Sequence, residues 1–282
     1  MWRRFILILC TILMIIASCI VDRNRSEKIM AINFKGASDG FLSFPVGTLQ
    51  NYDTKSIGGW VYVNSFLEGD GNEYMIQSIK SDLSLTGFSF RIGENSHKVY
   101  YFQDFDEGHG SCYVLASSTN AVISAPGLYH IMITWDRNYL HTAVLYINGV
   151  PVPVTQVDSS GNPGCDLGGG HELDDSTVSL ILGSPYTSSA TADAIDGWMS
   201  DWRIYNRELS SSEVYEIFKM RGDDNLLKGL VFRAKLDGAA GIQNFKGAVL
   251  AGTNYVKDSI VGAVGTPNNS IEGVEDIIMG GK

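Results

Sequence analysis

A stretch that begins at Tyr129 constrains the fold more than any other part of the chain. Apolar side chains alternate with other residues as far as Trp135, and a further strand-like run, HTAVLYI, leads to Asn148-Gly149 and then VPVPV. Asn-Gly tolerates the positive φ that both central positions of a tight turn need, so this pattern predicts a β-hairpin. Pro151 and Pro153 cannot donate to a ladder, and the returning strand should therefore lie at a sheet edge.

Upstream segments show the same period of two, which predicts strands with one buried face. They are Phe41 to Phe44, Trp60 to Val63, Tyr74 to Ile79 and Phe88 to Ile92.

One helix is predicted among these strands. Ser210 and Glu213 form a capping box, and the apolar residues from Val214 to Phe218 supply one face. Gly222 is placed to end the helix in a left-handed conformation.

Five motifs between roughly Phe34 and Phe218 carry a family resemblance: FKGASDGFLSF, GGWVYV, TWD, YINGVPV and DGWMSDWRIYNREL. They resemble a laminin G-like (LamG) or pentraxin-like jelly roll of the concanavalin A-like class of lectins and glucanases. The resemblance implies an all-β fold, a jelly-roll β-sandwich of two antiparallel sheets with one short helix. It also places Trp60, Trp135, Ile204 and Tyr205 at core or sheet positions, where aromatic side chains pack rather than bind sugar.

The C-terminal segment GLVFRAKLDGAAG resembles the opening strands of such a domain, although it follows the closing helix. We therefore expect residues 30–282 to form one circularly permuted sandwich in which residues 226–282 supply the opening strands. The alternative is a truncated second repeat, which would leave apolar residues such as Phe232 without a sheet to cover them.

The charge of the chain limits its partners. The formal net charge is −10, and outside residues 1–29 the chain holds 16 basic and 29 acidic side chains. An acidic body is repelled by phosphate backbones, which disfavours nucleic acid and leaves glycans, proteins and divalent cations.

The N-terminus has the features of an export signal. Arg3 and Arg4 precede an apolar run from Phe5 to Ala17, which has the length of a signal-peptide core and is short for a membrane span. Ile16-Ala17-Ser18-Cys19 resembles a bacterial lipobox, which implies that residues 1–19 are a lipoprotein-type signal, that Cys19 carries the lipid and that residues 20–29 are a tether. Ile20 then favours the outer membrane, with a lipid anchor as the membrane attachment. The alternatives are an uncleaved anchor, an ordinary signal peptide, or translation that begins at Met30.

Two cysteines remain for the folded body, Cys112 and Cys165, both in Gly-rich segments. In an oxidising compartment they can form a disulfide, and the alternative is a pair of unrelated buried thiols.

Enzymatic relatives offer a test of catalysis. Laminarinase-type hydrolases of this fold carry Glu-x-Asp-x-x-Glu on one strand, and the nearest match is Glu172-Leu173-Asp174 with Thr177 in the last position. Without the second carboxylate there is no acid and nucleophile pair, so the sequence predicts a protein that is not an enzyme.

Pentraxins bind calcium partly through a Gln-Asp pair that follows a strand similar to the one ending at Leu182-Gly183. This chain has Ser184-Pro185-Tyr186 in that place, which argues against a pentraxin-type calcium site. No cofactor is therefore certain. Acidic clusters could still bind Ca²⁺ at Asp174 and Asp175, and the alternative is a solvated acidic rim. The predicted ligand-binding residues lie on the same polar loops, 103–112 and 156–176: Asp104, Asp106, His109, Asp166 and His171.

Arg221-Gly222-Asp223 spells the integrin tripeptide, but Gly222 already has a role in ending the helix. The sequence as a whole predicts an exported, lipid-anchored, non-catalytic module of the bacterial cell envelope that binds a glycan or a surface protein. The alternatives are a structural module of a fibre or virion, and an atypical glycan hydrolase or lyase.

Overall fold

The computed structural model describes residues 28–35, 41–44, 46–66, 72–79, 86–105, 113–124, 126–136, 143–158, 175–183, 195–236, 256–257, 264–267 and 271–278. One compact unit spans Met30–Glu275 and holds the sandwich. A second unit, Met1–Ile29 with Asp276–Lys282, contains only the outer ends of the first and last strands among its described residues.

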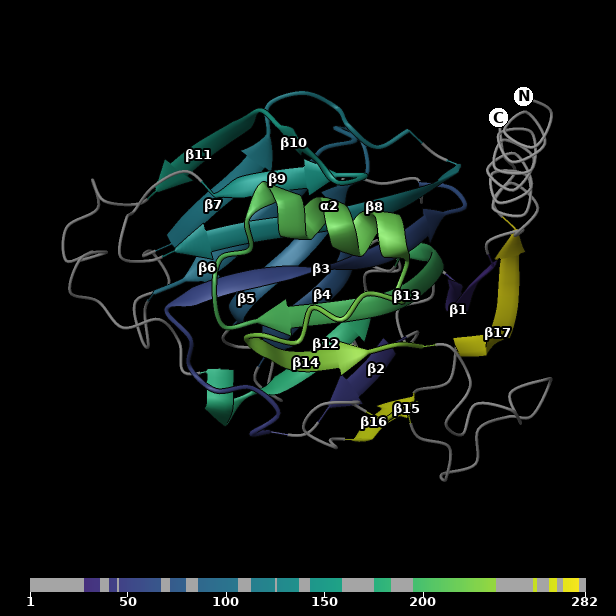
Figure 1. The fold of residues 1–282 in the computed structure, drawn as a ribbon. Helices are drawn as coiled ribbons and strands as arrows, with labels where there is room; N and C mark the ends of the chain where they lie inside the picture. Colours follow the sequence, from purple (N-terminus) through teal and green to yellow (C-terminus); the bar gives the residue numbers. More distant parts are fainter. Residues whose placement is uncertain are drawn as a thin grey trace, which may run out of the picture. The chain divides into compact units, whose positions relative to one another are not determined.

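Eight of the described strands form one sheet, called sheet A here, in the order β10-β9-β8-β3-β13-β1-β17, with β14 also paired to β13 (Figure 1). They are β1 (Lys28–Lys35), β3 (Thr54–Val63), β8 (Gly127–Asp136), β9 (Val144–Ile147), β10 (Val150–Val152), β13 (Asp196–Tyr205), β14 (Leu230–Ala234) and β17 (Ile271–Ile278).

Nine described strands form sheet B, in the order β11-β7-β6-β5-β4-β12-β2-β16-β15. They are β2 (Phe41–Phe44), β4 (Asn72–Ile79), β5 (Thr86–Gly93), β6 (Val99–Asp104), β7 (Tyr113–Ser118), β11 (Val154–Asp158), β12 (Ser179–Gly183), β15 (Val256–Lys257) and β16 (Val264–Pro267). Neighbouring strands pair antiparallel in both sheets, as in β3 with β8 and β5 with β6. With the helix α2 (Ser211–Met220), this confirms the predicted all-β sandwich with one short helix.

The Asn148-Gly149 turn joins β9 to β10 as predicted. Both residues have positive φ, 52° and 75°, and Val150 pairs with Ile147 across the turn. The returning strand is split at Pro153, so that β10 forms the edge of sheet A and β11 the edge of sheet B. Among the described strands, none pairs with the outer side of β10 or β11, which confirms the predicted edge position of the prolines.

The main core lies between the two sheets. Phe44 of sheet B meets Phe232 of sheet A edge-on with 5.0 Å between ring centroids, and Phe90 meets Trp202 at 6.2 Å. All four side chains are buried. Within sheet A, β3 has room for only a glycine at position 59, because a Cβ atom there would lie 2.7 Å from the ring of Trp202 in the neighbouring strand β13.

The central strands of sheet A, β3, β8 and β13, are buried on both faces, which differs from the prediction of strands with one exposed face. In β8, Ile131 and Ile133 point into the main core, while His130 and Met132 on the other face are also buried. The helix α2 packs over this second face through Val214 and Ile217 (Figure 1). The sequence pattern identifies an amphipathic helix but not the surface that it covers.

The start of α2 confirms the predicted capping box, and its C-terminal end adds a left-handed residue that was not predicted. The Ser210 side chain accepts a hydrogen bond from the Glu213 backbone N–H, and the Glu213 side chain accepts one from the Ser210 backbone. At the C-terminus the left-handed cap residue is Arg221, with φ of 49°, and Gly222 follows with φ of 95°. The tripeptide Arg221-Gly222-Asp223 is thus the terminator of the helix.

The strand β14 from the C-terminal segment pairs with β13 and joins the core. Phe232 and Ala234 are fully buried, and Leu236 is nearly so. The proposed permutation of residues 226–282 stays a prediction, because most of that range lies outside the described residues. Among the described residues, no helix has the length and apolar character needed to cross a membrane.

Candidate binding site

One end of the sandwich gathers the strand ends that bear the predicted polar loops. In sheet A, Thr54 begins β3 and pairs with Asp136, the last residue of β8. In sheet B, Asp104 ends β6 opposite Tyr113, the first residue of β7. We call this the Lys55 end, after the buried lysine that links the two sheets there.

Lys55 points inward because it shares the core-facing side of β3 with Ile57. Its Nζ donates to Gln103 Oε1 of β6 at 3.2 Å and forms an ion pair with Asp175 Oδ2 at 2.9 Å. All three side chains are buried. Burial of an ammonium group is unfavourable unless the charge is paired and hydrogen-bonded, and these contacts supply both.

The partners of Lys55 are fixed in turn. Gln103 Oε1 also accepts from the Tyr101 hydroxyl at 2.7 Å, and Gln103 Nε2 donates to the Gly87 carbonyl at 2.8 Å. The Phe88 ring centroid lies 5.6 Å from the Lys55 ammonium group. The network joins β3, β5, β6 and the short 3₁₀ helix η2 (Asp175–Thr177), which makes the Lys55 end a rigid base.

Partly exposed hydroxyl and carboxylate side chains surround this base. They come from strand ends and from η2. Thr54 and Asp136 lie on the outward side of sheet A, Asp104 and Tyr113 lie on the outward side of sheet B, and Ser176 lies in η2. Thr54 Oγ1 donates to Asp136 Oδ1 at 3.2 Å, so some of these groups also hold one another. Such side chains can hydrogen-bond to sugar hydroxyls.

The structure places two of the predicted site residues at the Lys55 end. Asp104 ends β6 and is partly exposed, while Asp175 is buried and bound to Lys55 rather than lying on an acidic rim. The other predicted residues lie outside the described part of the chain: Cys19, Asp106, His109, Cys112, Cys165, Asp166, His171 and Asp174. Their roles stay predictions.

In the described part of the chain, no three His, Cys, Asp or Glu side chains are grouped as a metal site. Calcium binding by Asp174 and Asp175 stays a prediction. The structure shows Oδ2 of Asp175 2.9 Å from the Lys55 ammonium group.

The outer face of sheet A carries a second buried network, under α2. Arg203 donates from Nη1 and Nη2 to Asp224 at 2.8 and 2.7 Å and from Nε to Asp201 at 3.1 Å. Arg233 of β14 donates to the other oxygen of Asp201 at 2.7 Å. Burial raises the pKa of Asp224, but the hydrogen bonds and charge of Arg203, the Leu226 N–H and the charge of Arg233 together outweigh it and lower that pKa below its ordinary value.

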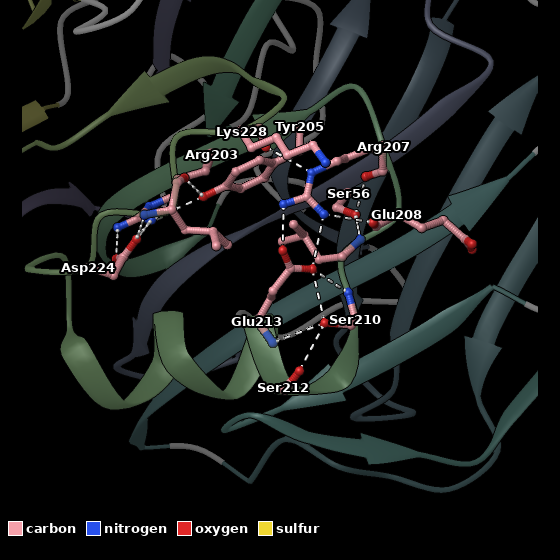
Figure 2. A network of polar contacts seen from close by, with 12 residues as sticks. Ser56, Arg203, Tyr205, Arg207, Glu208, Ser210, Ser212, Glu213, Asp224 and Lys228 are labelled. Carbon is pink, nitrogen blue, oxygen red and sulfur yellow. Dashed lines mark hydrogen bonds and ion pairs between the residues drawn. The ribbon is translucent and has the colours of Figure 1, made fainter.

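Arg207 and Glu213 hold the start of the helix next to this network (Figure 2). Arg207 Nη2 lies 2.7 Å from Glu213 Oε1, and Glu213 Oε2 accepts from the Ser210 N–H at 2.8 Å. The outer face of sheet A is therefore closed by the helix and its polar contacts, and the Lys55 end is the better candidate site.

Sequence reasoning did not identify Lys55, Gln103, Arg203 or Asp201. The signal was present, because Lys55 stands at an inward position of a strand that is otherwise apolar, and Asp201 and Arg203 lie inside a buried strand. A charged residue in such a place requires a partner, but the partner of Lys55 is 120 residues away in the chain.

Comparison with known proteins gives one family match. Residues 35–215 match the family model Laminin_G_3, described as the concanavalin A-like lectin/glucanases superfamily. A search of curated proteins gave no match.

Three solved structures illustrate the similarity of fold. A protein of Bacteroides ovatus ATCC 8483, whose proposed role is carbohydrate binding, is 17% identical with a TM-score of 0.54 over 89% of this chain and 60% of its own. The chain thus spans less than two thirds of that protein. A SAP-like pentraxin of Limulus polyphemus is 13% identical (TM-score 0.42; 67% of this chain, 82% of its own). A Trypanosoma rangeli sialidase is 14% identical (TM-score 0.43; 67% and 27%).

Proposed function

Because the chain belongs to the concanavalin A-like lectin/glucanases superfamily, we propose that it is a module that binds glycans without cleaving them. The observation that carries the proposal is the Lys55 end, where partly exposed hydroxyl and carboxylate side chains lie at strand ends next to a buried polar network. Recognition sites of rigid sandwiches are commonly placed on the strand ends and their loops. The fold alone does not select this function, because the same fold serves unrelated activities.

Asp104 is the described residue best placed to test the proposal. The full-length protein should be retarded in native gels that contain a soluble neutral polysaccharide such as laminarin, xyloglucan or galactomannan, and Asp104→Ala should weaken that binding. Asn120→Ala, an exposed change beyond the opposite end of β7, is the matched control and should bind like the wild type. Failure to bind any glycan in a broad panel would favour a structural module instead.

The non-catalytic part of the proposal has a separate test. Prolonged incubation with the same polysaccharides should release no reducing sugar. Release that is lost in Glu172→Gln would show that the protein is a hydrolase or lyase of this fold.

We further propose export and lipid attachment, which rest on Arg3, Arg4, the apolar run and Cys19. Expressed in a Gram-negative host, the protein should partition into the detergent phase with lipid on Cys19, and Cys19→Ala should release or stall it. An intact mass that corresponds to an unmodified chain starting at Met1 or Met30 would contradict this proposal.

A further inference from the structure

The outward side chains of the two sheets differ in their exposure to solvent. On sheet A the outward rings of Trp60 and Tyr205 are buried beneath α2. On sheet B the outward side chains of β6 and β7, which include Tyr100, Phe102 and Tyr113, are partly exposed. The single α-helix in the described part of the chain packs on sheet A and not on this face.

The period of two in β6 explains why these rings face outward. Val99, Tyr101 and Gln103 are buried between the sheets, and the residues between them take the other side. Across the strands, Tyr100 is paired with Arg91 of β5 and with Ser117 of β7. Tyr113 is paired with Asp104, at the Lys55 end.

Contacts among neighbours hold the rings in place. Phe102 and Tyr113 stack with 5.5 Å between centroids and 27° between planes. The Arg91 guanidinium group lies 5.9 Å from the Tyr100 ring, and the Tyr100 hydroxyl donates to Ser96 Oγ at 3.0 Å. The rings are thus fixed before a ligand arrives, which reduces the entropy lost on binding.

We propose that this surface, formed by Arg91, Tyr100, Phe102, Asp104, Tyr113 and Ser117, binds a stretch of a polysaccharide chain. The inference deepens the proposed function and rests on it. Aromatic rings offer apolar area to the C–H faces of pyranose rings, while the guanidinium, hydroxyl and carboxylate groups beside them can bind sugar hydroxyls.

The size and charge of the surface favour a glycan chain. From Tyr100 to Asp104 the strand runs about 13 Å, which is long enough for more than one linked pyranose ring. Both a cation and an anion lie on it, in a chain of net charge −10, so a polyanion such as nucleic acid is a poor fit. The surface also reaches the Lys55 end at Asp104 and Tyr113, so one chain can contact both.

The test uses the full-length protein and variants of exposed rings. Tyr100→Ala and Phe102→Ala should each weaken binding to whichever of laminarin, xyloglucan or galactomannan the wild type binds, by about tenfold, measured by calorimetry. Tyr100→Phe, which keeps the ring, should retain most of the affinity. Tyr215→Ala removes an exposed ring from α2 and is the matched control, expected to stay within about twofold of the wild type.

A blocking variant keeps the test valid if the loss of a ring disturbs folding. Ser117→Trp leaves all three rings in place but covers the position opposite Tyr100, and it should weaken binding as well. Circular dichroism would verify that each variant is folded.

The outcomes separate this inference from the proposed function. If the wild type binds and Asp104→Ala loses affinity while folded Tyr100→Ala, Phe102→Ala and Ser117→Trp bind normally, the sheet B surface is overturned and glycan binding stands. If the wild type binds no glycan, both fall.

Discussion

At the scale of single residues, the buried Lys55–Asp175 ion pair has a large expected effect on stability. The two side chains are buried, 2.9 Å apart, and come from a strand and a turn far apart in the chain. Removal of one partner from a buried pair leaves an uncompensated charge, which is more harmful than removal of both.

Lys55→Met should therefore lower the free energy of unfolding by about 3 to 5 kcal/mol, because Asp175 would remain charged in the interior. The double variant Lys55→Met/Asp175→Asn should recover part of that loss. Urea denaturation of the three proteins measures both values. A double variant as unstable as Lys55→Met would show that the charge of Asp175 is not the cause.

His130 is the second residue with a distinct physical consequence. Both of its ring nitrogens are buried without a hydrogen-bond partner, and its ring packs 5.1 Å from Trp60 and 6.0 Å from Phe218. Burial lowers its pKa to about 3, and the charges of Asp201, Arg203 and Asp224 change that value less. The folded protein thus holds a neutral histidine beneath α2.

This predicts acid sensitivity with a definite sign. Between pH 6.5, the ordinary pKa of histidine, and about 3, the unfolded chain binds one proton at this site that the folded chain does not. Above that range the neutral histidine does not reduce stability. As the pH is lowered through the range, the free energy of unfolding should fall by about 1.4 kcal/mol for each pH unit. In His130→Leu, the slope of the free energy of unfolding against pH should correspond to one fewer proton bound on unfolding, as measured by denaturation from pH 7 to pH 4. An unchanged slope would contradict the assignment.

At the scale of elements, α2 is fixed at its start by the capping box and by Arg207. The hydrogen bond from Arg207, followed by those from Ser210, lowers the pKa of Glu213 to about 2. A lowered carboxyl pKa means that the stabilisation is present above about pH 4.5 and is lost as the pH falls toward 2.

Two substitutions test this cap. Ser210→Ala should destabilise the protein by about 1 kcal/mol at neutral pH, because a backbone N–H loses its partner. Glu213→Gln should also destabilise it at pH 7, and this deficit should shrink as the pH is lowered from 5 toward 2. A deficit that does not depend on pH would indicate that the Glu213 charge has no role.

The local elements could be predicted from the sequence, because their signals are local. The Asn148-Gly149 turn, the edge position of the prolines and the Ser210 capping box each depend on residues within a few positions of one another. The left-handed cap at Arg221 and the bulge in β13, where Asp201 has φ of 47°, were not predicted. Contacts with later residues accompany both: Arg233 donates to the Gly222 carbonyl next to the cap, and Asp201 is held by Arg233 and by the Lys235 carbonyl.

The candidate site could be predicted only in outline. Asp104 ends β6 and is partly exposed, and its role in binding stays a prediction, whereas the buried network depends on the distant pairing of Lys55 with Asp175. The outward rings of β6 could not be assigned either, because the run VYYFQD is aromatic on both faces. Which face is covered depends on how sheet B packs against sheet A, and that packing involves strands far from β6 in the sequence.

At the scale of the whole molecule, the outer faces of the two sheets differ: the helix covers one, and the other carries partly exposed side chains. Sheet A is closed by α2 and by the Arg203 network, and it supplies rigidity. Sheet B leaves aromatic and polar side chains partly exposed. The strand β14 belongs to the closed side, since Arg233 reaches Asp201 and Phe232 packs against Phe44.

Truncation tests whether the C-terminal segment is an essential part of this sandwich. Ending the chain after Gly222 would remove β14, Asp224 and Arg233, and would leave Arg203 buried with one anionic partner. The truncated chain should be insoluble or lack cooperative unfolding, because it exposes a ladder of β13 and uncovers core side chains. Phe232→Ala in the full chain is the milder companion and should lower the free energy of unfolding by about 3 to 5 kcal/mol. A soluble fragment that ends at Gly222 and unfolds cooperatively would instead favour a truncated second repeat, because the first sandwich would then be complete without residues 226–282.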